Sequence, residues 1–182
     1  MLGELVFVGG AVTSLLVTDE GAGAPRPTLD VDAIAEITSY AEYAAFGDCL
    51  RLLGFSEDWR EGAPLCRWVR EGAILDVMPL DEKILGFSNR WYCAAMQTAV
   101  TERLSGELEI RVVTAPYFLA TKLEAFKGRG RGDFFGSHDL EGCPGPSRSR
   151  EPSPDYHRSR SASRACRAVD LRAIRFLRSL SM

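Results

Sequence analysis

Residues 5–10 read Leu-Val-Phe-Val-Gly-Gly, and residues 29–37 read Leu-Asp-Val-Asp-Ala-Ile-Ala-Glu-Ile. The first stretch is a short apolar run that ends in a glycine turn, which predicts a buried strand. The second stretch alternates, which predicts a strand whose residues point by turns to its two faces. Asp30 and Asp32 therefore share one face of this strand, about 7 Å apart at the backbone.

The rest of the chain to residue 141 alternates apolar patterns with turn signals. Spacings of three and four residues predict helices, and short runs bounded by glycine predict strands. Helices are expected over 11–17, 40–53, 89–100 and 116–127, a hairpin over 65–69 and 73–78, and a strand over 108–113. This order predicts an α/β (or α+β) fold, in which a small mixed sheet is flanked by helices in one domain over residues 1–141.

Asp76 lies inside the apolar run Ala73-Ile-Leu-Asp-Val-Met78. An ionised carboxylate in such a place is costly unless it is paired or metal-bound. If its strand neighbours the strand of Asp30 and Asp32, Asp76 becomes a third ligand of one site. Hard divalent ions such as Mg²⁺ prefer carboxylate oxygen, so we expect Asp30, Asp32 and Asp76 to hold Mg²⁺ or Mn²⁺.

Gly9 and Gly10 follow a strand and precede a helix, where backbone N–H groups can face phosphate oxygens without Cβ obstruction. Three side chains around this turn are candidate phosphate contacts: Thr13, Ser14 and Arg26. Taken singly, each feature also has a structural explanation. The Gly-Gly pair can be only a turn, the two aspartates a solvated strand face, and Asp76 an edge residue or a salt-bridge partner.

The pattern Val8-Gly9-Gly10, Asp30-Val31-Asp32 and Asp76 resembles that of the polymerase-β-like nucleotidyltransferases. Residues 26–32 (Arg-Pro-Thr-Leu-Asp-Val-Asp) and 118–126 (Phe-Leu-Ala-Thr-Lys-Leu-Glu-Ala-Phe) narrow the resemblance to nucleotidyltransferases of the AbiEii/AbiGii toxin type, over about residues 5–141. The resemblance implies a nucleotidyltransferase fold. It also implies that Lys122 contacts the nucleotide or assists proton transfer, and that Asp139 positions Lys122 or the acceptor.

The resemblance implies a metal-dependent enzyme that transfers an NMP from an NTP to an acceptor hydroxyl. The implied acceptor is RNA, such as a tRNA end, and the implied role is a toxin silenced by a cognate antitoxin. Four arginines (Arg67, Arg70, Arg129 and Arg131) are a candidate RNA footprint. Two alternatives remain open: transfer to a small molecule such as an antibiotic, and a non-catalytic, truncated remnant of the fold.

The net charge of −3 hides a difference between the two parts of the chain. Residues 1–140 carry 13 Lys+Arg against 21 Asp+Glu, whereas residues 141–182 carry nine arginines, no lysine and four acids. The Arg/Ser/Pro-rich residues 142–182 are expected to be disordered, with a weak amphipathic helix over 166–180. Either this tail binds RNA or it is an out-of-frame translation of GC-rich DNA, and its composition favours the second interpretation.

Two further expectations follow from composition. The sequence has no apolar run long enough for a membrane span and no basic leader at residue 1, which predicts a cytoplasmic protein without membrane contact. Its five cysteines show no metal-binding spacing, and Cys49, Cys66 and Cys93 are expected to be small core residues.

Overall fold

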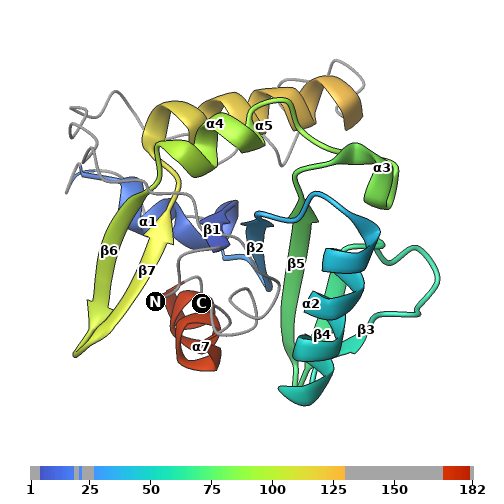
Figure 1. Cartoon of the computed structure of the whole chain (residues 1–182). Coiled ribbons are helices and arrows are strands. Elements are labelled where there is room, and N and C mark those ends of the chain that lie inside the picture. Colours follow the sequence, from blue (N-terminus) through green and yellow to red (C-terminus); the bar gives the residue numbers. More distant parts are fainter. Residues whose placement is uncertain (1–4, 19–20, 22–26, 130–169, 181–182) are drawn as a thin grey trace.

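A computed structural model describes residues 5–18, 21, 27–129 and 170–180. Within these residues the chain forms a mixed sheet of seven strands, in the order β3-β4-β5-β2-β1-β7-β6. The strands are β1 (Leu5–Val8), β2 (Asp30–Ala35), β3 (Ser56–Glu57), β4 (Arg67–Arg70), β5 (Ala73–Pro79), β6 (Val100–Ser105) and β7 (Leu108–Val112). Helices flank the sheet (Figure 1), so the predicted α/β class with a mixed sheet is confirmed.

The central strands are those that the sequence marks as buried. All four residues of β1 are buried, as its continuous apolar run predicts. β1 pairs antiparallel with β2 and parallel with β7, and β2 pairs parallel with β5. A fully buried strand at the centre of a sheet needs apolar side chains on both faces, which β1 supplies.

The β4–β5 hairpin turns at Glu71 and Gly72, which both have positive φ, at 47° and 78°. Two central residues with positive φ form the turn that matches the natural twist of a hairpin. This two-residue turn places Arg70 opposite Ala73 and, three residues further back, Arg67 opposite Asp76. A local turn signal thus fixes which side chains of β4 meet those of β5.

One face of the sheet is covered by α2 (Tyr40–Leu52) and α7 (Leu171–Leu180). A Cβ atom at Gly47 of α2 would lie 3.1 Å from the Trp68 ring, so α2 packs on the face to which Trp68 points. Ala73 shares that face and lines a pocket together with Leu171 and Ile174 of α7. α7 contacts β2, β5 and β7 (Figure 1).

The carboxylates Asp30, Asp32 and Asp76 belong to the opposite face, by strand alternation. Arg111 of β7 shares their face and donates a hydrogen bond to the Met96 carbonyl oxygen of α4 (Tyr92–Gln97). α4 in turn packs against α5 (Ala115–Arg129). The sheet therefore has helices on both sides. Three short helical segments complete the described elements: η1 (Gly10–Val12), α1 (Thr13–Leu16) and α3 (Glu82–Leu85).

The structure differs from the sequence predictions at four elements. The helix predicted over 89–100 ends at Gln97, and β6 begins at Val100. β6 alternates between half-buried and exposed residues at the edge of the sheet, and its few apolar side chains give a weak signal. The two-residue strand β3 and the four-residue helix α3 were also not predicted, because segments this short show no periodicity.

The short segment predicted as a helix over 166–180 is a helix over Leu171–Leu180. Residues 142–169, for which disorder is predicted, lie outside the described residues. Of the three cysteines expected in the core, Cys66 is buried, Cys49 is half-buried and Cys93 is exposed. The expectation for Cys93 was wrong, because the residues of α4 that are buried are Ala95 and Met96.

Candidate carboxylate site on the sheet

The sheet register brings the three predicted carboxylates to one place. β2 and β5 lie side by side, with Asp32 directly opposite Asp76. Asp30 lies two residues before Asp32 and therefore on the same face. The sequence left open whether the strand of Asp76 neighbours that of Asp30, and this register answers that it does.

Gly9 lies directly against this cluster. Its φ is 70° and its ψ is −163°, a conformation that is almost restricted to glycine. A Cβ atom at this position would lie 1.9 Å from Oδ2 of Asp32. The glycine turn after β1 thus lets the backbone approach the Asp32 carboxylate, as a site that brings backbone N–H groups close to a ligand would need.

Arg67 of β4 binds two of the three carboxylates. Its Nε and one terminal nitrogen donate to Oδ1 and Oδ2 of Asp76 at 2.9 and 2.7 Å. The same terminal nitrogen donates to Oδ2 of Asp30 at 3.1 Å. The Asp76 side chain is 8% exposed, Arg67 is 20% exposed and Asp30 is 33% exposed. The pair between Arg67 and Asp76 is therefore a nearly buried, two-pronged ion pair.

The electrostatics follow from this arrangement. Hydrogen bonding to Asp76, together with the charges of Asp76 and Asp30, raises the pKa of Arg67 above its usual range. The neighbouring thiol of Cys66 is buried. Its burial, with the charges of Asp76 and Asp32 adding to it, raises its pKa to about 12. Burial disfavours the charged thiolate, and the two nearby carboxylate charges add to this effect, so the Cys66 thiol is neutral at neutral pH.

The three carboxylates lie on the same face of the sheet. They offer the oxygen ligands that Mg²⁺ and Mn²⁺ prefer. Their described arrangement does not yet enclose one. Among the residues that the structure describes, no three Asp, Glu, His or Cys side chains converge to hold a metal ion. Arg67 occupies both oxygens of Asp76 and one of Asp30, so a metal ion would have to displace or share these contacts.

The other predicted site residues are placed as follows. Lys122 lies on α5, with its Nζ 5.4 Å from the centroid of the Phe118 ring. Ser14 lies on α1, and its Oγ is one of few buried side-chain atoms in the described part of the chain without a hydrogen-bond partner. Gly10 lies against Thr28, whose hydroxyl donates to Asp30. Arg26 and Asp139 lie outside the described residues.

Arg67 is the member of the site that sequence reasoning missed. It was expected only as part of an RNA footprint, and its guanidinium instead lies on the carboxylates. Arg70, the second of these arginines, donates to the Leu53 carbonyl oxygen. The predicted hairpin over 65–69 and 73–78 has a three-residue turn, which would pair residue 67 with residue 75. The observed turn has two residues, Glu71 and Gly72, and it pairs Arg67 with Asp76 instead.

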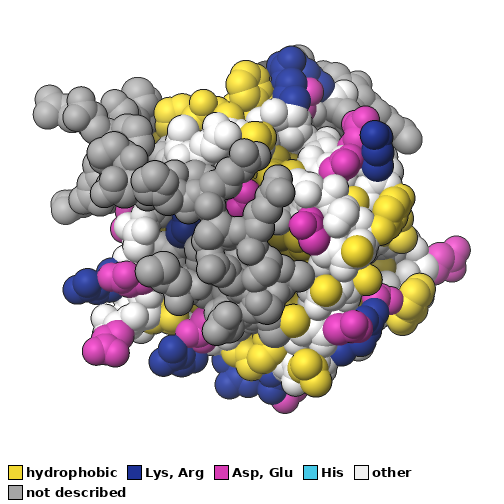
Figure 2. All heavy atoms as spheres, in the orientation of Figure 1, with side chains coloured by type: hydrophobic (Ala, Val, Ile, Leu, Met, Phe, Trp, Pro, Cys, Tyr) yellow, Lys and Arg dark blue, Asp and Glu magenta, His cyan; other side chains and the backbone are white. Residues whose placement is uncertain are grey.

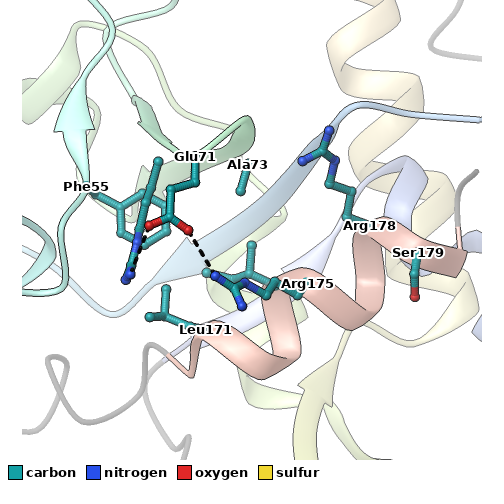
Figure 3. A pocket seen from close by; sticks show the side chains of 9 residues that line it. Phe55, Glu71, Ala73, Leu171, Arg175, Arg178 and Ser179 are labelled. Carbon is teal, nitrogen blue, oxygen red and sulfur yellow. Dashed lines mark hydrogen bonds and ion pairs between the residues drawn. The ribbon is translucent and has the colours of Figure 1, made fainter.

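A pocket lies on the face of the sheet opposite to the carboxylates. It has a volume of about 330 Å³ and lies between α7 and the β4–β5 hairpin. Arg175 reaches Glu71 at 3.0 Å (Figure 3), and the Arg178 guanidinium lies 3.6 Å from the position that a Cβ at Gly72 would take. The pocket is separated by the sheet from the carboxylates and is not part of the candidate site.

The surface carries no single basic patch over the described part of the face shown in Figure 2, where basic and acidic side chains are interspersed. No helix among the described residues has the length and apolar character needed to cross a bilayer. No protein-family model and no curated protein matches the chain. The candidate site therefore stands on its geometry and on the sequence pattern.

Proposed function

We propose that this chain is a metal-dependent nucleotidyltransferase that transfers an NMP from an NTP to an acceptor hydroxyl. The observation that carries the proposal is the register of β2 and β5, which sets Asp32 opposite Asp76 with Asp30 on the same face. Asp76 is buried, and an ionised carboxylate there is costly unless a cation binds it. Phosphoryl transfer uses such oxygen-ligand sites, because divalent ions there neutralise phosphate charge.

Asp30, Asp32 and Asp76 are the residues that would hold Mg²⁺ or Mn²⁺. The bound ion would supply positive charge next to the phosphates. Gly9 and Gly10 would present backbone N–H groups to the triphosphate beside Asp32, because their lack of a Cβ lets the backbone lie directly against Asp32 and Thr28. Lys122 would add a positive charge toward the nucleotide, and this role rests on the resemblance of residues 118–126 alone.

The acceptor is proposed to be RNA, such as a tRNA end, in the setting of a toxin and its antitoxin. This part rests on the family resemblance and not on surface charge, since residues 1–140 are acidic and Arg67 is engaged with Asp76. Transfer to a small molecule is the competing outcome that the following experiment separates.

The test is incubation of the full chain with α-labelled NTPs, Mg²⁺, total tRNA and an aminoglycoside. Asp32→Asn should reduce labelling roughly a hundredfold or more, because it removes charge that a bound cation needs. Asp48→Asn is the matched control, since Asp48 is 76% exposed and pairs only across the surface of α2 with Arg51. It should label as the wild type does.

The outcomes are distinct. Label on tRNA supports the proposal as stated, and label on the aminoglycoside alone supports nucleotidyl transfer but replaces the acceptor. Equal labelling by wild type and Asp32→Asn, or none by either, contradicts the enzyme and favours a non-catalytic form of the fold. Growth arrest on expression that Asp32→Asn abolishes and Asp48→Asn does not would support the toxin role.

A further inference from the structure

Arg67 lies where a cation of the carboxylate cluster belongs. The register of the hairpin sets its Cα opposite that of Asp76, and β2 presents Asp30 from the next strand. Its guanidinium donates hydrogen bonds to both carboxylate oxygens of Asp76, with N–O distances of 2.9 and 2.7 Å. The resulting arrangement satisfies a carboxylate that is 8% exposed without any bound ion.

A divalent ion and Arg67 need the same oxygens. A two-pronged contact uses the lone pairs of Asp76 that face the site, so an ion bound to Asp76 would share an oxygen with the guanidinium. The ion and the guanidinium would then lie on the same carboxylate, and two positive charges this close repel strongly where they are partly buried. Binding of the ion and the full contact of Arg67 therefore oppose each other.

The two contacts of Arg67 differ in strength. The contact to Asp30 is the longest, at 3.1 Å, and Asp30 is 33% exposed. The contact to Asp76 is short and nearly buried. The Asp30 contact is therefore the weaker of the two, and a cation held by Asp30 and Asp32 would weaken it more readily than the contact to Asp76.

We propose that Arg67 is an internal counter-ion of this cluster that competes with the divalent cation for Asp30 and Asp76. Arg67 is a positioning residue in this role, because it acts through the carboxylates. The inference rests on the proposed function only in taking Asp30, Asp32 and Asp76 as the metal ligands. It predicts that removal of the guanidinium strengthens cation binding.

The experiment titrates the full chain with Mn²⁺ and follows free Mn²⁺ by its EPR signal, in wild type, Arg67→Gln and Arg103→Gln. Arg67→Gln should bind Mn²⁺ at least about tenfold more tightly, since a charge-assisted hydrogen bond is worth roughly that factor. Arg103 is 72% exposed and pairs with Glu109 across the β6–β7 hairpin. Arg103→Gln makes the same change in net charge and should bind as the wild type does.

A thermal readout guards against loss of the fold. Arg67→Gln leaves Asp76 without its counter-ion, so its Tm without metal should fall, and added Mn²⁺ should raise it by more than it raises that of the wild type. Arg67→Lys keeps the charge but not the fork, and its Mn²⁺ affinity should lie between those of wild type and Arg67→Gln. If Arg67→Gln does not fold, Arg67→Lys decides the question.

Each result has one consequence. Equal Mn²⁺ affinity of wild type and the Arg67 variants, with binding lost in Asp32→Asn, overturns the competition and leaves the proposed metal site standing. Weaker binding in Arg67→Gln likewise overturns it and makes Arg67 a support of the ligands. No Mn²⁺ binding by any folded variant contradicts the metal site of the proposed function itself.

Discussion

At the scale of single residues, Gly9 is the glycine of the described chain at which an added Cβ would collide most closely with a neighbour. Its backbone conformation is one that only glycine adopts without strain, and a side chain there would collide with Asp32. We expect Gly9→Ala to lower the free energy of unfolding by about 3 kcal/mol or more, because the strain and the collision add.

Urea unfolding of Gly9→Ala beside Gly62→Ala measures the two effects separately. Gly62 has a φ of 80° but no atom within 4 Å of an added Cβ. Gly62→Ala should therefore lower the free energy of unfolding only by the strain of a positive φ, about 1 kcal/mol. Equal losses for the two variants would contradict the close approach of Gly9 to Asp32.

Cys66 shows how the acidic cluster affects its neighbour. Burial, together with Asp76 and Asp32, raises the pKa of the Cys66 thiol from an ordinary value of 9.0 to about 12. The neutral thiol is thus favoured in the folded state, so its contribution to stability is complete below pH 9 and declines as pH rises from 9 toward 12.

Alkylation by iodoacetamide at pH 8, mapped by mass spectrometry, tests the environment of Cys66. The exposed Cys93 should react first, because the thiolate is the reactive form and Cys93 is accessible. Cys66 should react only after urea is added. Similar rates for Cys66 and Cys93 in the folded protein would contradict the burial of Cys66.

At the scale of elements, the start of α2 shows how side chains satisfy a helix end. Ser39 Oγ accepts a hydrogen bond from the Glu42 N–H, and Glu42 accepts one from the Thr38 N–H at 2.8 Å. This reciprocal pattern is close to a capping box. The hydrogen bond from the Thr38 backbone lowers the pKa of Glu42 below 4.5.

The lowered pKa sets a pH window for this contact. A depressed carboxyl pKa stabilises the fold above pH 4.5, and the effect is lost as pH falls through the folded value. Glu42→Gln should therefore be less stable than wild type at pH 7, with a difference that shrinks in acid. Unfolding by guanidinium chloride at pH 7 and in acid measures this difference in stability. Glu61→Gln, in an exposed loop, is the control.

At the scale of the whole molecule, the segment after residue 169 contributes to the core. Ala173, Ile174 and Leu177 of α7 are buried, although the preceding sequence is rich in arginine and serine. Leu177→Ala should cost about 2 to 5 kcal/mol, as for other buried leucines. Ser179→Ala, on the exposed side of the same helix, should change stability by less than about 0.5 kcal/mol.

Removal of the C-terminal segment tests the same contribution of α7. A helix that the fold needs would make removal of residues 171–182 destabilise the protein, because β2, β5 and β7 lose an apolar cover. If Leu177→Ala and the truncated chain unfold at the same urea concentration as wild type, α7 does not stabilise the sheet.

The local features of the fold follow from short stretches of sequence. Alternation in residues 29–37 set Asp30 and Asp32 on one face, the apolar run made β1 a buried strand, and helical spacing located α2 and α5. These features depend on residues within a few positions of one another, so their patterns can be read directly. Short edge elements such as β6 lack such a pattern and were missed.

Which strands are neighbours depends on the packing of the whole chain. The pairing of β5 with β2 brings Asp76 to Asp32, the β4 register brings Arg67 to Asp76, and α7 meets the sheet from the far end of the chain. Long-range pairings are chosen by the packing and hydrogen bonding of the whole sheet, which no local window of sequence contains. The carboxylates were therefore visible in the sequence, whereas the contacts of Arg67 with Asp30 and Asp76 were visible only in the fold.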